Sequence, residues 1–522
     1  MKILFSLLFS AVFVFFSSAQ TEVYIDSHDI AAQGMAFVIS AEYAKAIAEF
    51  EQISPSDTNY TLAQLEMVLS HFELRHDSTV LQMCSKAIAA DGEWDHLFRE
   101  YLIESLTRLK DSAAFKQIDF ARKRYPFNED FILLEATALQ KWGRYDESAD
   151  VLKKLILRNP FNKNAHYFLG QMMADKGDFI RATLSLEAFL MLSTESNVKT
   201  SAALVMLSNI FKNKHDVSIK NAKKNILFRD EEELMESGLA LKDGYKSEAP
   251  LDDPIVRQSD VLMKNLSFQK ASNDFWMDFY VPFFVKVKEQ GMIRAYTYQF
   301  LSFLDHKELQ KGVKKFAVEI EKFRTFATAY FEKINEASTI VVLGKLVTAP
   351  KYYDAGNMVS TGKKNGDTRS GTWYFFYESG ALESVLSYDN AANKVDSAYD
   401  FYSDGKIKTR AFYVADLLDG KYSEYYANGE LKTQLFYKAD SLDGLQKTYY
   451  ANGALKESID FKNGQRHGSD MEYDHSGNKE TELLYSRGEL EGVQKGFYPG
   501  AILKSEVPYK SGQREGTALF YH

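Results

Sequence analysis

The sequence contains a single cysteine, Cys84, among its 522 residues. One cysteine cannot form an intrachain disulfide and cannot supply a cysteine-rich metal site. The chain must therefore be stabilised by packing alone. We expect Cys84 to be a small apolar residue inside a helical core, with a reactive thiol as the alternative.

Positive charge is also in deficit. Lysine and arginine number 63 against 72 aspartates and glutamates, which gives a formal net charge of -9. A surface that binds nucleic acid needs a clustered basic excess to replace the counterions on phosphates. We therefore expect no nucleic-acid partner.

Signatures of catalysis are missing from the sequence as well. It has no Gly-x-Ser-x-Gly elbow, no Gly-Lys-Ser/Thr phosphate loop and no Gly-x-Gly-x-x-Gly fingerprint. His71 and His76 are five residues apart, which places them on different faces of a helix. His467 and His475 fall in one predicted hairpin without a further ligand at metal spacing, so a metal site there is only an alternative. These observations predict that the chain is not an enzyme and holds no cofactor.

The first residues form a short apolar segment. Lys2 precedes an apolar run over residues 3–16, and small residues follow at 17–19. The run is shorter than the roughly 20 residues that span a bilayer. This pattern is typical of a signal peptide over 1–19 and predicts an exported chain, periplasmic or secreted, that starts at Gln20. An uncleaved membrane anchor is the alternative.

A period of 34 residues marks the first part of the chain. Two successive units carry residues of the same kind: Gly143, Tyr145, Ser148, Leu152 and Leu155, then Gly177, Phe179, Ala182, Leu186 and Phe189. This pattern resembles the tetratricopeptide (TPR) signature, in which glycine ends one helix and an aromatic residue opens the next. It predicts TPR-like helical repeats over 20–245, with about five helical hairpins between residues 30 and 195.

The TPR resemblance also implies where a partner binds. In that family the first helix of each hairpin lines a concave face, which binds a protein or peptide. The positions that correspond to that face in this sequence are His96, Arg99, Gln140, Lys141, Asn164, Tyr167 and Gln171.

Residues 246–344 form an additional helical region that includes the aromatic run 275–280. We expect these aromatic residues to be buried, since an apolar helix face in a long protein is more often core than contact surface. A partner-binding stripe is the alternative.

From residue 345 to the end, a period of 24 residues takes over. Turn glycines recur at Gly356, Gly380, Gly405, Gly429, Gly453, Gly477 and Gly500. Asn428-Gly429 and Asn452-Gly453 are dipeptides of two-residue hairpin turns, in which both central residues have positive φ. A second set marks the crossing between hairpins: Gly420, Gly444, Gly468, Gly492 and Gly516.

Aromatic residues follow the same period, in one ladder before the turns and another after them. The ladder before the turns is Phe401, Tyr425, Tyr449, Tyr473, Phe497 and Tyr521. Because the period is regular, we interpret the ladders as structural, with a glycan, lipid or peptide platform as the alternative. Asp416, Asp419, Asp440 and Asp443 are interpreted as turn residues, with calcium binding as the alternative.

The motif Gly-x-x-x-x-Tyr-Tyr-x-Asn-Gly-x-Leu-Lys over residues 420–432 and 444–456 resembles the bacterial MORN variant. That family is often labelled the antitoxin part of a toxin–antitoxin pair, and it implies an antiparallel array of β-hairpins. The predicted fold class is an α+β multidomain repeat protein, with an α-solenoid followed by this array.

Together these features predict a non-catalytic scaffold outside the cytoplasm that binds a protein or peptide. The alternatives are an envelope glycan- or lipid-binding module and an antitoxin-like protein.

Overall fold

The computed structural model describes residues 27–90, 92, 94–212, 226–269, 273–304, 306–354 and 356–522. The predicted signal peptide, residues 1–19, lies outside these ranges. The chain divides into two compact units, Met1–Ser105 and Leu106–His522. Each unit is described by itself.

The first unit consists of helices. They are α1 (Ser27–Ile39), α2 (Tyr43–Phe50), α3 (Tyr60–Glu73), α4 (Asp77–Ala89) and α5 (Asp95–Arg108), which ends beyond the boundary of the unit. Ala46 and Phe50, which lie three repeat lengths before Ser148 and Leu152, are fully buried. Cys84 is also buried, and burial raises the pKa of its thiol to about 12. The prediction that Cys84 is a core residue is confirmed.

The prediction that His71 and His76 lie on different helix faces is wrong. Helix α3 ends at Glu73, and Arg75 has a positive φ that turns the chain into α4. His76 is therefore not on the same helix as His71, and their Nδ1 atoms lie 3.1 Å apart.

The second unit begins with helices that continue the 34-residue repeat. They are α6 (Ala113–Arg124), α7 (Glu129–Lys141), α8 (Tyr145–Arg158), α9 (Lys163–Lys176), α10 (Phe179–Leu192) and α11 (Val198–Phe211). Gly143 and Gly177 have positive φ directly after α7 and α9, and Tyr145 and Phe179 open the next helices, as predicted. Gly170 brings α9 against α10, because a Cβ built on it would lie 2.7 Å from Cγ of Leu186.

The helices that follow pack into the same core. They are α12 (Arg229–Glu236), α13 (Pro254–Asn265), α14 (Phe275–Glu289), α15 (Ile293–Leu301), α16 (Lys307–Lys315) and α17 (Ala317–Ala337), with 3-10 turns at Ile226–Phe228 and Leu239–Leu241. Trp276, Phe279 and Tyr280 are buried in a cluster that also contains Leu186 and Phe189 of α10. The interpretation of the aromatic run as core is confirmed. The boundary that we expected near residue 245 does not separate two cores.

The rest of the chain is β-structure. The strands before the regular repeat are β1 (Thr339–Val342), β2 (Lys345–Thr348), β3 (Lys351–Asp354), β4 (Asn357–Asn365), β5 (Thr368–Phe376), β6 (Leu382–Tyr388) and β7 (Lys394–Phe401). The long strands of the regular repeat are β8 (Ile407–Val414), β10 (Gly420–Tyr425), β11 (Leu431–Lys438), β13 (Gly444–Tyr449), β14 (Leu455–Lys462), β15 (Gln465–Tyr473), β16 (Lys479–Ser486), β18 (Gly492–Tyr498) and β19 (Ile502–Lys510). Short strands complete it: β9 (Leu417–Leu418), β12 (Ser441–Leu442), β17 (Glu489–Leu490), β20 (Gln513–Arg514) and β21 (Leu519–Phe520).

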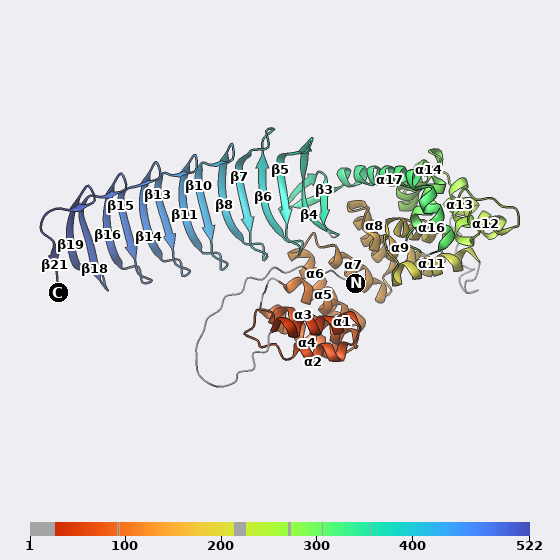
Figure 1. Ribbon diagram of the computed structural model, residues 1–522, viewed down its shortest axis with the longest axis horizontal. Coiled ribbons are helices and arrows are strands. Elements are labelled where there is room, and N and C mark those ends of the chain that lie inside the picture. Colours follow the sequence, from red (N-terminus) through yellow and green to blue (C-terminus); the bar gives the residue numbers. More distant parts are fainter. Residues whose placement is uncertain are drawn as a thin grey trace. The chain divides into compact units, whose positions relative to one another are not determined.

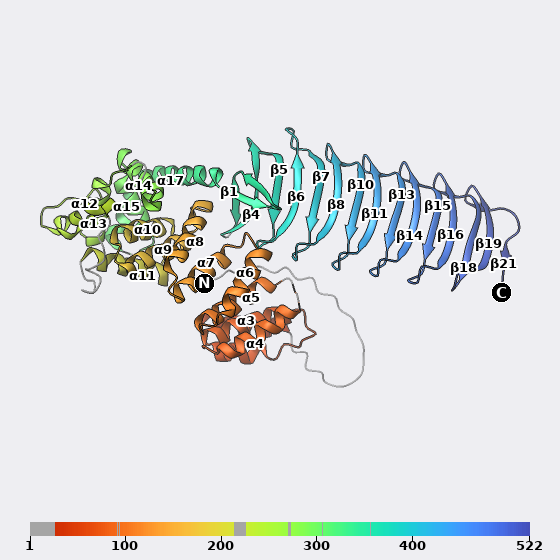
Figure 2. The same ribbon diagram turned by 180° about the vertical axis from the view of Figure 1, so that it is seen from behind.

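Strands β3 to β21 form one antiparallel sheet, the β-array, in which neighbours along the chain lie side by side (Figure 1). The reverse view shows the same succession from β3 toward β21 (Figure 2). Strands β1 and β2 form a separate hairpin. The predicted fold class, helical repeats followed by an array of antiparallel hairpins, is confirmed.

The hairpin turns differ from the prediction in one respect. Gly429 has φ 92°, but Asn428 does not have positive φ; its side chain instead accepts a hydrogen bond from the Glu430 backbone at 3.0 Å. The two-residue turns with positive φ at both positions lie at the opposite ends of the strands. They are Ala415-Asp416, Ala439-Asp440, Asn463-Gly464, Arg487-Gly488 and Ser511-Gly512. Aspartate tolerates this conformation, which is why the sequence signal for these turns is less obvious.

Hydrogen bonds link successive hairpins at both ends of the strands. The Tyr426 hydroxyl donates to the Tyr449 carbonyl at 2.8 Å, and Tyr402 and Tyr450 make the same bond one repeat away on either side. At the other end, Asp440 Oδ1 accepts from the Leu418 backbone at 2.6 Å. The acidic turn residues therefore have a structural role, as predicted. The ladder rings themselves are mostly half-buried.

A helix-connecting loop anchors the start of the β-array within the second unit. Phe127, between α6 and α7, packs against Phe376 with ring centroids 4.4 Å apart, and its backbone N–H donates to the Gly380 carbonyl. A Cβ at Gly380 would lie 2.2 Å from the Asn128 nitrogen, so only glycine fits in this turn.

Candidate partner-binding cleft

Three of the predicted contact residues are buried. His96 and Arg99 on α5 and Tyr167 on α9 are each less than a tenth exposed. Arg99 forms an ion pair with Asp95 on the same helix at 2.8 Å, and the Tyr167 ring packs against Phe189. These side chains face the helical core, so the positions inferred from the TPR resemblance do not present them to a partner.

The other four predicted residues reach the surface to different degrees. Lys141 is exposed, whereas Gln140, Asn164 and Gln171 are half-buried. Gln140 donates to Ser148, and Asn164 accepts from Lys199 at 2.8 Å. All four belong to the second unit, whereas His96 and Arg99 belong to the first. A role for these four residues in partner contact stays a prediction.

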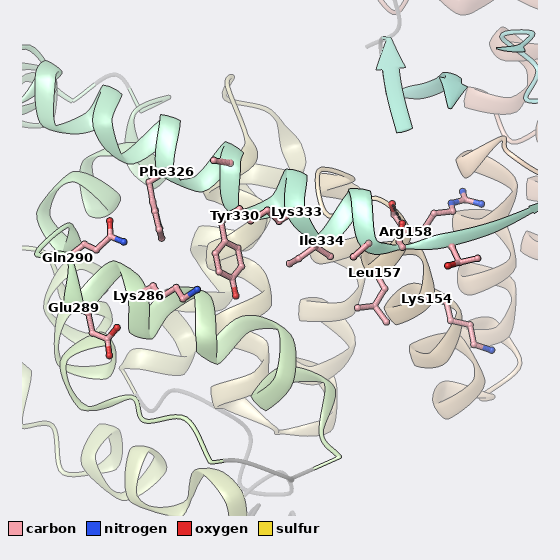
Figure 3. A pocket seen from close by; sticks show the side chains of 14 residues that line it. Lys154, Leu157, Arg158, Lys286, Glu289, Gln290, Phe326, Tyr330, Lys333 and Ile334 are labelled. Atoms are coloured by element: carbon pink, nitrogen blue, oxygen red, sulfur yellow. Dashed lines mark hydrogen bonds between the residues drawn. The ribbon is translucent and has the colours of Figure 1, made fainter. Parts of the chain in front are cut away.

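A cleft that sequence reasoning did not identify lies along α17. Its volume is about 1060 Å³, and it is lined by α8, α14, α17 and the residues that lead into β1. Phe326, Tyr330 and Ile334 occupy successive turns of α17 and point into the space between these elements (Figure 3). They share one face because residues four apart are neighbours on a helix. These three side chains form a half-buried apolar strip along the cleft.

Packing fixes the centre of this strip. The Tyr330 ring contacts Phe283 of α14, with centroids 5.3 Å apart. The Lys286 ammonium lies 5.1 Å from the centroid of the same ring, a cation–π contact. Contacts with α14 therefore fix the position of the Tyr330 ring in the wall of the cleft.

Basic residues surround the apolar strip. Four cationic side chains, those of Lys154, Arg158, Lys286 and Lys333, and one carboxylate, that of Glu289, line the cleft, which gives a lining charge of +3. Within the described ranges, Lys154, Lys286 and Lys333 form no ion pair with a carboxylate, and all three are exposed. The cleft thus concentrates unpaired positive charge on a chain whose net charge is -9.

Arg158 has a different role from the three lysines. It pairs with the buried carboxylate of Glu129 at 3.2 Å, and Asn159 and Asn162 also donate to that carboxylate. Burial raises the pKa of Glu129, and the Arg158 guanidinium opposes this shift. Arg158 therefore anchors the end of α8, and only part of its charge faces the cleft.

A buried lysine holds the end of α17 to the β-array. Lys351 Nζ, in β3, donates to the Asn335 carbonyl at 2.7 Å and to the Ser338 carbonyl. Burial, with a smaller contribution from Arg158, lowers the pKa of Lys351 to about 8. The Asn335 side chain in turn accepts from the Lys351 backbone at 2.9 Å. This arrangement ties the cleft-lining helix to the first strand of the array.

The most strongly shifted carboxyl and imidazole groups lie in the core rather than in the cleft. His166 Nδ1 accepts from the Tyr280 hydroxyl at 2.6 Å while Nε2 donates to the Pro160 carbonyl, and burial lowers the His166 pKa to about 4. Glu187 accepts from Ser259 and Tyr296, and burial raises its pKa to about 7. Both groups are fully buried, which closes them to a substrate.

The described residues contain no group of three or more histidine, cysteine, aspartate or glutamate side chains placed to hold a metal ion. No helix among them combines the length and the apolar character needed to span a bilayer.

Comparison with known families supports one part of the sequence interpretation. Residues 369–390, 418–439 and 442–463 match the MORN repeat variant. These stretches fall in the β-array, over β5 and β6 and from β9 to β14. The matched family is described as a repeat and not by an activity. The antitoxin interpretation therefore has no support. No curated protein matches the chain. The helical hairpins and the MORN-type β-hairpins together make this chain a protein built from two kinds of repeat.

Proposed function

We propose that the chain is a non-catalytic scaffold that binds a protein partner outside the cytoplasm. The observation that carries the proposal is that recurring and non-recurring residues of the repeats have different roles. The residues that recur are used for packing: Gly170 between helices, Tyr426 and Asp440 between hairpins. The side chains that face solvent are free to differ between units, as recognition of a partner requires.

The cleft along α17 supports the same proposal. It combines a half-buried apolar strip with lysines that lack a carboxylate partner in the described chain. Protein-binding surfaces commonly combine an apolar centre with a polar rim. The location outside the cytoplasm rests on the predicted signal peptide, which is a separate part of the proposal.

Crosslinking of the tagged full-length chain in its source cell tests the binding function. We expect a defined set of protein partners that is absent when the purified chain is added only after lysis. Crosslinks to glycan or lipid without protein would favour the envelope-ligand alternative. No reproducible crosslink above the added-after-lysis control would contradict the scaffold function.

Export is tested independently by fractionation and N-terminal sequencing. We expect a mature chain that begins at Gln20 in an extracytoplasmic fraction. Intact Met1 on most molecules in the cytoplasm would contradict this part of the proposal and leave partner binding untouched.

A further inference from the structure

We infer that the cleft along α17 binds an acidic segment of a partner protein, an inference that rests on the proposed scaffold function. Charge is the first argument. Lys154, Lys286 and Lys333 come from three different helices and line one cleft without a carboxylate partner among the described residues. Because Arg158 is paired with Glu129, the three lysines and Glu289 leave a local charge of +2, on a chain whose overall charge is -9. Carboxylates are the groups that complement it.

The shape of the cleft indicates a peptide rather than a compact anion. The lining residues of α17 run from Phe326 to Ala337, which at 1.5 Å per residue corresponds to about 16 Å. An extended chain covers that length with about five residues. Lys286 lies beside Tyr330 in the middle of the cleft, whereas Lys154 lies toward the end near Arg158 (Figure 3). They are therefore placed to contact different residues of one peptide.

The apolar strip defines what lies between the carboxylates. Phe326, Tyr330 and Ile334 are half-buried and face the cleft, so an apolar side chain of the ligand gains by covering them. The chemistry that fits is a short segment with acidic residues on both sides of aliphatic or aromatic ones. Arg158 is already paired with Glu129, so the three lysines are the charged recognition groups.

The walls of the cleft are also preorganised. The Tyr330 ring is fixed between Phe283 and Lys286, and Lys351 holds the end of α17 through two backbone carbonyls. A cleft whose walls are held by the core loses little freedom when a ligand binds.

A binding assay on the full-length chain tests this inference. The probe is a fluorescent hexapeptide of alternating glutamate and leucine, and the comparison peptide carries lysine in place of glutamate. We compare the unaltered chain with K154E/K286E/K333E by fluorescence anisotropy at low ionic strength. The matched control is K421E/K438E/K462E, which makes the same change of net charge at exposed lysines of the β-array.

We expect the acidic peptide to bind the unaltered chain and the control alike, and to bind the cleft variant about tenfold more weakly or worse. Added salt should weaken the binding. Equal loss in both variants would show a general charge effect and overturn the inference, as would equal binding of the lysine peptide. Binding of phosphatidylserine vesicles through the same lysines, without peptide binding, would assign the cleft to lipid and also overturn it.

The inference and the proposed function fail in different ways. If K154E/K286E/K333E retains all cellular crosslinks, partner binding stands and the cleft is not the site. If no partner is captured in the cell, the peptide assay still decides what the cleft recognises.

Discussion

Asp470 stands where the units on either side of it in the β-array carry a glutamine. Gln446 and Gln494 stand 24 residues before and after it, and all three side chains are at most 6% exposed. Gln446 Oε1 accepts from the Phe436 backbone N–H at 2.7 Å, and its Nε2 donates to the Phe436 and Gly444 carbonyls. Gln494 bonds the Leu484 backbone in the same way. The glutamines thus bridge a gap where the strand ladder opens beside the crossing glycine.

Aspartate cannot make this bridge. It is one methylene shorter than glutamine and, when ionised, has no donor. Asp470 Oδ1 is buried and finds no hydrogen-bond partner among the described residues, while Oδ2 pairs with Arg466 at 2.9 Å. Burial raises the pKa of Asp470, and the Arg466 guanidinium opposes this shift.

We therefore predict that Asp470→Gln stabilises the array locally. A buried polar atom without a partner costs about 1 to 3 kcal/mol. The substitution also removes the ion pair with Arg466, whose side chain is 41% exposed, so that loss is about 0 to 1 kcal/mol. The two ranges leave a net gain of about 0 to 3 kcal/mol, or about 1.5 kcal/mol at their midpoints.

Native-state hydrogen exchange on the full-length chain measures this gain, because repeat arrays open locally. Amides of β14, β15 and β16 should exchange about tenfold more slowly in the variant, which corresponds to about 1.4 kcal/mol. Gln446→Asp is the matched control: it introduces the same defect one repeat earlier and should accelerate exchange in β11 and β13. Faster exchange around Asp470→Gln would show that the Arg466 pair outweighs the missing bridge and would refute the reasoning.

Three further predictions concern groups in other parts of the structure. Glu187 has a pKa near 7 in the folded chain against an ordinary 4.5, so its contribution to stability is full below pH 4.5 and is lost as the pH rises through 7. The free energy of unfolding of Glu187→Gln, measured by chemical unfolding relative to the unaltered chain, should therefore rise by up to about 3 kcal/mol between pH 4 and pH 8. A constant difference in free energy across that range would contradict the pKa shift. Tyr426→Phe removes the hydrogen bond from the Tyr426 hydroxyl to the Tyr449 carbonyl and should lower local stability by about 0.5 to 1.5 kcal/mol. Hydrogen exchange in β10 and β13 should become faster, and unchanged exchange would contradict the prediction. Gly170→Ala places a Cβ 2.7 Å from Leu186 and should destabilise the packing of α9 against α10 by about 1 to 3 kcal/mol. An unchanged melting temperature would mean that the two helices shift apart with no loss of stability.

Residues that recur at a fixed interval allowed the fold to be predicted from sequence. Gly143 and Gly177 placed the helix ends, and the glycines from Gly380 to Gly500 placed one end of every hairpin. A packing position demands the same kind of residue in each unit, so the period is visible in the chain itself. The type of turn was harder to predict, because Asn428-Gly429 fits two turn geometries and only the backbone conformation distinguishes them.

The direction of individual side chains was also beyond the sequence pattern. His96, Arg99 and Tyr167 occupy first-helix positions that the TPR resemblance assigns to a concave surface, yet they are buried. Tyr167 packs against Phe189 of α10, the second helix of its own hairpin, and Arg99 pairs with Asp95 on α5. The repeat pattern places each helix in the hairpin, but side-chain packing decides which side chains of that helix are covered.

The sequence by itself thus determined the two repeat types, their order and most of their turns, because each depends on residues that lie within one repeat length of each other. Only the tertiary structure decided the candidate site. Lys154, Lys286 and Lys333 are separated by 132 and 47 positions and follow no period. They meet because α8, α14 and α17 pack into one core, and because Lys351 fixes the end of α17. Long-range packing that brings unlike segments together leaves no repeated signal in the chain.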